Sequence, residues 1–268
     1  MSKKSESREI TFILPCAGEG KRLGYCGHKE LYPIEKDRYL IDYSLEHVNE
    51  AVNWTQKYAD LDVKVVVVIR PWKTEVYDYV KSHLATVNVK WVYFDDKLFE
   101  WPGSVHSARS LYSDYNMVLL PDSYLSLSKE NITRDLKGRN LAELAISELE
   151  RTSAVFGYMR CNSPDRLKSL GALKVEQSKT SHGNDDESAI ITYFQDKPDR
   201  LLQKYNGYWC CYGFREEVGD ELYKYLSSSV KKTAGNIEHE SFHPAGAFQI
   251  QNYLDLGTPE NIERFRLL

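Results

Sequence analysis

The segment Ile10-Thr11-Phe12-Ile13-Leu14-Pro15-Cys16-Ala17-Gly18-Glu19-Gly20-Lys21-Arg22-Leu23 decides how this 268-residue chain folds. Its first five residues are apolar or β-branched and predict a short buried strand. Gly18 and Gly20 follow where that strand ends, and glycines in such a place let backbone N–H groups approach phosphate oxygens. Arg22 and, further along the chain, Lys29 supply the opposite charge. The segment therefore predicts a strand that runs into a phosphate-binding loop.

Two other kinds of phosphate loop do not fit the same letters. A dinucleotide-binding fingerprint requires glycine where Leu23 stands. A Walker loop requires serine or threonine where Arg22 stands, and glycine where Pro15 stands. Neither kind of loop is therefore expected.

Apolar runs and helical patterns alternate through the first half of the chain. Strands are expected at 10–14, 63–69, 89–94 and 117–120, with helical spacing between them at 40–48, 76–84 and 105–111. Such alternation favours an α/β fold with a parallel sheet, in which ligands collect at the carboxyl ends of the strands. Asp122 directly follows one of these runs, so its carboxylate is a candidate ligand for a hard divalent cation.

The second half of the chain is richer in strand patterns. A helix is expected at 141–149, and strands at 154–159, 172–175, 190–194 and 208–214. Residues 177–187 are polar without periodicity and predict a solvated hairpin or loop. No repeat or linker divides the chain, so we expect a single domain over 1–268, with a first half at 8–138 and a second half at 139–268.

Composition excludes several classes of function. The net charge of -4, from 35 basic and 39 acidic residues, supplies no positive field for nucleic acid. No run of about 18 apolar residues occurs, and the polar first residues lack a signal-peptide pattern, so neither membrane nor secretion is expected. The five cysteines form no C-x-x-C pair and, with the histidines, show no zinc spacing, which favours a reducing cytoplasm.

The loop and the segment Lys29-Glu30-Leu31-Tyr32-Pro33-Ile34 together read G-x-G-x-R-L and K-x-L-x-P-I. This pair of motifs resembles the signature of the sugar-1-phosphate nucleotidyltransferases, such as the glucose-1-phosphate thymidylyltransferases. The resemblance implies a Rossmann-like nucleotidyltransferase fold, with a mostly parallel mixed central sheet flanked by helices. It also implies a nucleoside triphosphate and a sugar 1-phosphate as substrates, and Mg²⁺ as cofactor. By the same resemblance, the catalytic residues are Arg22 and Lys29, and the nucleotide-binding residues are Ala17, Gly18, Glu19 and Gly20.

Further segments extend the resemblance to most of the chain. Tyr253 to Glu260 is similar to the family's aromatic-x-D-x-G-T-P-E segment, which makes Asp255 the second magnesium ligand beside Asp122. Tyr193 to Pro198 resembles the family's F-x-E-K-P segment. The resemblance implies that Lys197 binds the sugar phosphate and that Asp196, one methylene shorter than the usual Glu, contacts the sugar hydroxyls. Two weaker similarities place Trp101 and Gly103 beside the base, and Gly171 near the sugar.

Some positions depart from the family pattern. Cys16 stands where alanine is usual, Lys21 stands where threonine or serine is usual, and the loop from Arg22 to Lys29 is short. Three alternative functions are considered. The chain could be a noncatalytic nucleotide-sugar-binding regulatory protein, a related glycosyltransferase, or a nucleotidyltransferase for another acceptor such as a cyclitol phosphate or a phosphocholine-like compound. The glycosyltransferase is disfavoured because Asp122-Ser123-Tyr124 lacks the second aspartate of a D-x-D motif. The base, the sugar and a homo-oligomeric state are left open.

Overall fold

One nine-stranded sheet forms the centre of the computed structural model, which describes residues 8–58, 60–98, 100–127, 139–177, 189–233 and 235–267. The strand order is β5-β4-β1-β6-β11-β8-β12-β10-β9. The strands are β1 (Arg8–Pro15), β4 (Leu61–Ile69), β5 (Asn88–Tyr93), β6 (Tyr115–Val118), β8 (Ala154–Arg160), β9 (Gly171–Gln177), β10 (Ala189–Asp196), β11 (Gly207–Arg215) and β12 (Ala245–Gln249).

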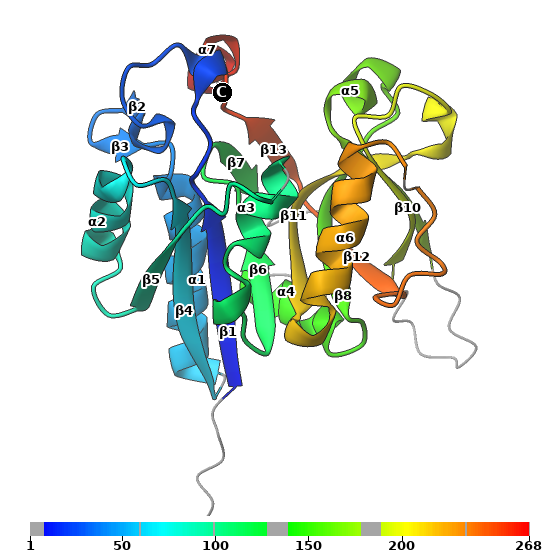
Figure 1. Ribbon diagram of the computed structural model, residues 1–268, viewed down its shortest axis with the longest axis horizontal. Helices are drawn as coiled ribbons and strands as arrows, with labels where there is room; N and C mark the ends of the chain where they lie inside the picture. The colour runs from blue at the N-terminus through cyan, green and yellow to red at the C-terminus, as the bar shows by residue number, and fades with distance from the viewer. Residues whose placement is uncertain are drawn as a thin grey trace, which may run out of the picture.

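Helices cover both faces of this sheet, because strand residues alternate between two apolar clusters. Phe12 and Leu14 of β1 join the cluster that contains residues of α1 (Asp42–Tyr58), α2 (Thr74–His83) and α4 (Leu141–Leu149). Ile13 points the other way, into the cluster with α3 (Glu100–His106) and α6 (Gly219–Val230). Figure 1 shows α3 and α6 in front of the sheet and α1 behind it. The fold is thus a three-layer α/β structure.

The sheet changes from parallel to mixed along its width. β5, β4, β1 and β6 run parallel, as the alternation in the first half predicts. β11 is antiparallel to both β6 and β8, while β12 is parallel to β8. Gly207 and Tyr208 at the start of β11 also pair with β9, so β11, β8, β12, β10 and β9 close on themselves. The second half of the sheet is therefore mixed.

Two small ribbons and two short helices lie at the carboxyl end of the parallel strands. β7 (Ser123–Ser126) pairs antiparallel with β13 (Asn252–Asp255), and β2 (Pro33–Glu35) pairs with β3 (Arg38–Tyr39). An apolar cluster joins the two sequence motifs to this region, because Leu23 and Ile34 pack with Leu256 and with Ile262 of α7 (Pro259–Arg266). The second helix, α5 (Pro164–Ser169), lies beside β9 (Figure 1).

Most expected elements occur close to their predicted bounds. The helix at 141–149 is α4, whose N-cap Asn140 accepts a hydrogen bond from the backbone N–H of Glu143. The third helix instead begins at Glu100 and ends at His106, and a separate 3-10 turn follows at Arg109–Leu111. The expected loop at 177–187 falls almost wholly on 178–188, outside the described residues. Within the described residues, no helix is long and apolar enough to cross a membrane.

Candidate nucleotide-binding site

A cleft of about 450 Å³ opens above the carboxyl ends of the parallel strands, which point to the top of Figure 1. It extends from the glycine loop after β1 to the first residues of β9 and the end of β10. A ligand cleft is expected at this edge in an open α/β sheet. Its lining includes Ala17, Gly18, Arg22, Lys29, Arg70, Glu100, Trp101, Asp122, Gly171, Asp196, Lys197, Trp209 and Asp255. A continuation of the cleft also borders Glu19 and Gly20.

The glycine loop packs against the side chain of Lys29. Gly20 has a left-handed φ of 70°, and a Cβ there would lie only 2.9 Å from Cβ of Lys29. Gly18 is also close, because its Cβ would lie 3.4 Å from Nζ of Lys29. Only glycine satisfies both the backbone angle and the close approach at position 20. The first motif and the second motif are therefore in direct contact.

Lys29 and Asp122 form a mostly buried ion pair. Nζ of Lys29 donates to Oδ2 of Asp122 at 2.6 Å, and the two side chains are 15% and 13% exposed. Burial by itself would raise the pKa of Asp122, but the charge and hydrogen bond of Lys29 outweigh it and hold that pKa below its ordinary value. Burial likewise opposes protonation of Lys29, yet Asp122 and Glu30 raise its pKa above the ordinary value. The pair is charged at neutral pH.

Arg22 and Asp255 form a second pair at the mouth of the same cleft. Their Nη1 and Oδ2 atoms lie 3.5 Å apart. Antiparallel pairing of β13 with β7 places Asp255 opposite Ser123, the residue after Asp122. The backbone N–H of Leu256 donates to the carbonyl of Asp122 at 2.8 Å. The ribbon thereby brings the two aspartates to one place, although about half of the sequence separates them.

Gly257 keeps the space between these groups open. A Cβ at position 257 would lie 2.8 Å from Oδ1 of Asp255, 3.0 Å from Nη2 of Arg22 and 3.4 Å from Oδ2 of Asp122. The backbone N–H of Gly257 also donates to Oδ1 of Asp255 at 2.8 Å. A larger residue at 257 would therefore push apart the groups that face the cleft.

The donor set at this place fits Mg²⁺. Among the described residues, no group of three or more His, Cys, Asp or Glu side chains is arranged to hold a metal ion. Mg²⁺ in nucleotide sites, however, is usually held by one or two carboxylates together with phosphate oxygens and water. Asp122 and Asp255 supply two such carboxylates beside space for phosphates, so the residues present suit that ion.

Aromatic and charged side chains line the other end of the cleft. The rings of Trp101 and Trp209 lie 5.0 Å apart, and a Cβ at Gly171 would lie 1.9 Å from Nε1 of Trp209. Gly171 therefore lets the indole lie against the backbone. Lys197 has a left-handed φ of 45°, and its backbone N–H donates to the carbonyl of Leu170 at 3.0 Å. A residue held in this disfavoured conformation often serves a site.

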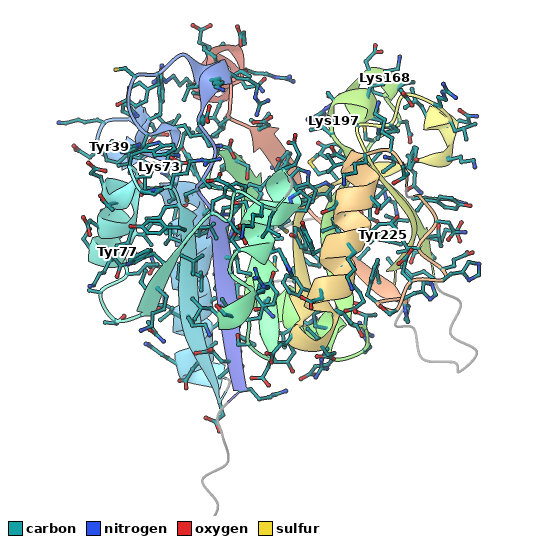
Figure 2. The ribbon with its side chains drawn as sticks, viewed as in Figure 1. Tyr39, Lys73, Tyr77, Lys168, Lys197 and Tyr225 are labelled. Carbon is teal, nitrogen blue, oxygen red and sulfur yellow. The ribbon has the colours of Figure 1, made fainter. Side chains whose placement is uncertain are left out.

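In Figure 2, Lys197 lies just below α5 on one side of the molecule. Lys73 lies on the opposite side, also in the upper part of the view.

Gly103, expected beside the base, does not line the cleft. It lies in α3, where a Cβ would meet Cβ of Leu98 at 2.7 Å. Sequence reasoning missed Arg70, which lines the cleft, and Lys73, which supports the glycine loop. It also missed Trp209. Arg70 and Lys73 follow the end of β4, a position that could have drawn attention to them.

Asp196→Asn is expected to stabilise the ligand-free protein near neutral pH. Burial raises the pKa of the Asp196 carboxyl, Lys197 opposes this rise, and Glu100 adds to it. A carboxyl whose pKa is higher in the folded than in the unfolded state lowers stability as the pH rises from the unfolded pKa through the folded pKa. The amide lacks this cost, so the advantage of the variant should grow over that range. Denaturant unfolding from about pH 4 to about pH 7 measures it, and an advantage independent of pH would contradict the interpretation.

The fold and the geometry of the cleft define a class, the α/β proteins with a Rossmann-like, partly parallel sheet and a ligand site at its carboxyl edge. Solved structures narrow this class to the nucleotidyltransferase fold. An apo UDP-glucose pyrophosphorylase is 14% identical with a TM-score of 0.67, over 97% of this chain and 99% of that one. A UTP-bound UDP-glucose pyrophosphorylase from Acinetobacter baumannii is 18% identical with a TM-score of 0.64, over 96% and 92%.

A third similar structure is a putative glucose-1-phosphate thymidylyltransferase from Bacillus anthracis, 14% identical with a TM-score of 0.61, over 96% and 93% of the two chains. Neither a protein-family model nor a curated protein sequence matches this chain. At such low identities the likeness is one of fold, and it extends over nearly the whole chain. The expected fold class is thus confirmed.

Proposed function

We propose that this chain is a magnesium-dependent sugar-1-phosphate nucleotidyltransferase, which joins a nucleotidyl group from a nucleoside triphosphate to a sugar 1-phosphate. The fold it shares with UDP-glucose pyrophosphorylases and a thymidylyltransferase supports this activity. The observation that carries the proposal is the meeting, at one edge of the sheet, of two cations and two carboxylates from four segments of the chain: Arg22, Lys29, Asp122 and Asp255.

In the proposed reaction, an oxygen of the sugar 1-phosphate forms a bond to the α-phosphorus of the triphosphate. The bond from that phosphorus to the oxygen bridging the α- and β-phosphates breaks, and pyrophosphate leaves with the electron pair. The second pKa of a phosphate monoester is about 6, so the attacking oxygen is already anionic and needs no general base. The protein has to align the groups in line and stabilise their charge.

The residues of the first half are suited to the triphosphate. Backbone groups from Ala17 to Gly20 border the cleft, and Arg22 and Lys29 present positive charge beside them. Asp122 and Asp255 would hold Mg²⁺, which when bound supplies charge neutralisation between the two polyanionic substrates. Trp101 lies further along the cleft, and we assign the base of the nucleotide to the space beside its ring. Residues 8–138 thus act as the nucleotide-binding half.

The residues of the second half are suited to the acceptor. Lys197 offers an ammonium to the sugar phosphate, and Asp196 and Gly171 border the space beyond it. Residues 139–268 would therefore act as the sugar-binding half, except that Asp255 reaches back to the metal position. The described cysteines are all free, which suits a location in the reducing cytoplasm.

Pyrophosphate release tests the proposed function directly. Four triphosphates with thymine, uracil, cytosine or guanine bases are each combined with several sugar 1-phosphates, a cyclitol phosphate and phosphocholine, with and without Mg²⁺. The proposal expects Mg²⁺-dependent release with at least one sugar 1-phosphate. If pyrophosphate is released only with the cyclitol phosphate or phosphocholine, the acceptor is that compound and not a sugar 1-phosphate. Tight binding of a nucleotide sugar without any release would favour the regulatory, noncatalytic alternative.

Lys197→Met is expected to raise KM for the sugar phosphate about 10- to 100-fold, because one charge-assisted contact to a phosphate is lost. KM for the triphosphate should change little, since Lys197 lies at the other end of the cleft from the glycine loop. Initial rates over a grid of both substrates measure the two constants. Lys168→Met on the neighbouring helix α5 is a matched control. An equal loss for both substrates would remove Lys197 from the acceptor site.

A further inference from the structure

A buried ion pair lies directly beneath the glycine loop and belongs to neither end of the cleft. Lys73 follows β4, and Glu30 belongs to the motif that supplies Lys29. Nζ of Lys73 lies 2.7 Å from Oε2 and 2.9 Å from Oε1 of Glu30, and the side chains are only 4% and 0% exposed. Neither side chain lines the cleft. Their role therefore needs a separate explanation.

The same ammonium also holds the backbone of the loop. Nζ of Lys73 donates to the carbonyls of Cys16 and Gly18, both at 2.7 Å. Nε of Arg70 donates to the carbonyl between them, that of Ala17, at 3.1 Å. Three successive loop carbonyls are thus bound by side chains from the turn after β4. These hydrogen bonds restrain the backbone of the loop at three successive residues.

Glu30 connects this support to the second motif. It directly follows Lys29, whose ammonium meets Asp122, and its own backbone carbonyl accepts a hydrogen bond from the N–H of Ile41 at 3.0 Å. Lys73 therefore ties the glycine loop to the segment that carries Lys29. Displacement of either partner would change the distance between the loop and the ammonium of Lys29.

Stability is a weak reason for such a pair. Burying two charges costs a large desolvation penalty, and well-packed apolar replacements are often neutral or stabilising. The pair also carries no net charge, so it adds little long-range attraction for a polyanion. Its specific geometry, with four acceptors around one ammonium, is what an apolar pair could not reproduce.

We propose that Lys73 and Glu30 are positioning residues that hold the glycine loop and Lys29 in the conformation that binds the triphosphate. The inference rests on the proposed function for the identity of the ligand. It assigns the pair no contact with substrate. Its expected effect is therefore on the affinity for the triphosphate chain, whatever the base, and not on the affinity for the sugar phosphate.

The test compares two double variants. Lys73→Met with Glu30→Met removes the pair without leaving a single buried charge. Lys64→Met with Glu9→Met is the matched control, because Lys64 and Glu9 form a partly buried pair on β4 and β1, remote from the cleft lining. Thermal unfolding establishes that both variants fold. Calorimetric titration with inorganic tripolyphosphate and Mg²⁺, and KM for each substrate by pyrophosphate release, are then measured.

We expect the first variant to bind tripolyphosphate at least tenfold more weakly, with KM for the triphosphate raised and KM for the sugar phosphate unchanged. The control should match the wild type in its tripolyphosphate affinity and in both KM values. If the Lys73→Met, Glu30→Met variant folds and still binds tripolyphosphate as tightly as the wild type does, the inference is wrong. If that variant does not fold, Glu30→Gln, which keeps the shape but loses the charge, decides: unchanged tripolyphosphate affinity overturns the inference, and weaker affinity supports it.

These outcomes are separable from those of the proposed function. Absence of pyrophosphate release by the wild type with every substrate pair would reject the activity. Tripolyphosphate binding would then still report on the loop by itself. Release by the wild type together with unchanged triphosphate KM in the first variant would reject the positioning role alone.

Discussion

Asp255→Asn is expected to lower turnover by about 10²- to 10³-fold, the size of loss that follows removal of one electrostatic contact to a transition state. Asparagine keeps the shape of the side chain but weakens its binding of a hard cation, because the carboxylate charge is lost. Folding should be little affected, since the partner Arg22 is largely exposed and solvent screens the pair. Steady-state pyrophosphate release over a Mg²⁺ titration measures the effect.

The Mg²⁺ titration separates two explanations for that loss. A ligand role predicts that the variant needs more Mg²⁺ for half-maximal activity, whereas a role only in orienting Arg22 predicts an unchanged requirement. Asp78→Asn, an exposed change on α2, is the control and should leave turnover unaltered. Full activity of Asp255→Asn at ordinary Mg²⁺ would remove Asp255 from the proposed metal site.

Lys29→Met is expected to abolish most activity and also to destabilise the fold. The ammonium lies against both the glycine loop and Asp122, so its loss should remove charge stabilisation at the proposed position of the triphosphate. It also leaves the mostly buried carboxylate of Asp122 unpaired, and breaking a buried pair in this way costs about 3 kcal/mol. Pyrophosphate release and urea unfolding measure the two effects separately.

The pH dependence of that destabilisation has a definite sign. In the wild type the Lys29 pairing holds the pKa of Asp122 below its ordinary value of 3.8. This stabilisation is present above the unfolded pKa and is lost as the pH falls through the folded one. The difference in free energy of unfolding between wild type and Lys29→Met should therefore be largest near neutral pH and shrink in acid. A difference that grows in acid would contradict the role of the pair.

The double variant Lys29→Met with Asp122→Asn separates stability from activity. It leaves no charge unpaired, so the free energy of unfolding should recover toward the wild-type value. Activity should stay lost, because neither the ammonium nor the carboxylate is restored. Recovery of activity in this variant would show that the pair serves folding alone.

Local patterns predicted much of the fold and part of the site. The alternation of apolar runs with helical spacing indicated the parallel strands, because a buried strand and an amphipathic helix each leave a periodic signature in the chain. Gly20 shows why the loop could be predicted as well: the requirement for glycine arises from its own φ and from nearby Lys29. Gly103, which rested on a loose match, packs against Leu98 and does not line the cleft.

Long-range pairing decided the rest. β7 and β13 are four residues each and carry little periodic signal, so their pairing could not be derived from either segment. Lys73 and Arg70 likewise look like ordinary polar residues after a strand until the fold places three loop carbonyls beside them. Side-chain networks of this kind depend on distances between segments, which no local pattern encodes.

By itself the sequence determined the α/β class, the glycine loop and the charged residue types that the proposed substrates require, because these depend on local periodicity and chemistry. Only the tertiary structure decided which charges meet. The register that sets Asp255 opposite Ser123 brings it beside Asp122, and packing then holds Lys29 against the mostly buried carboxylate of Asp122 rather than in solvent. The physical reason is that electrostatic interactions depend on separation and dielectric surroundings, and both arise only when distant segments pack together.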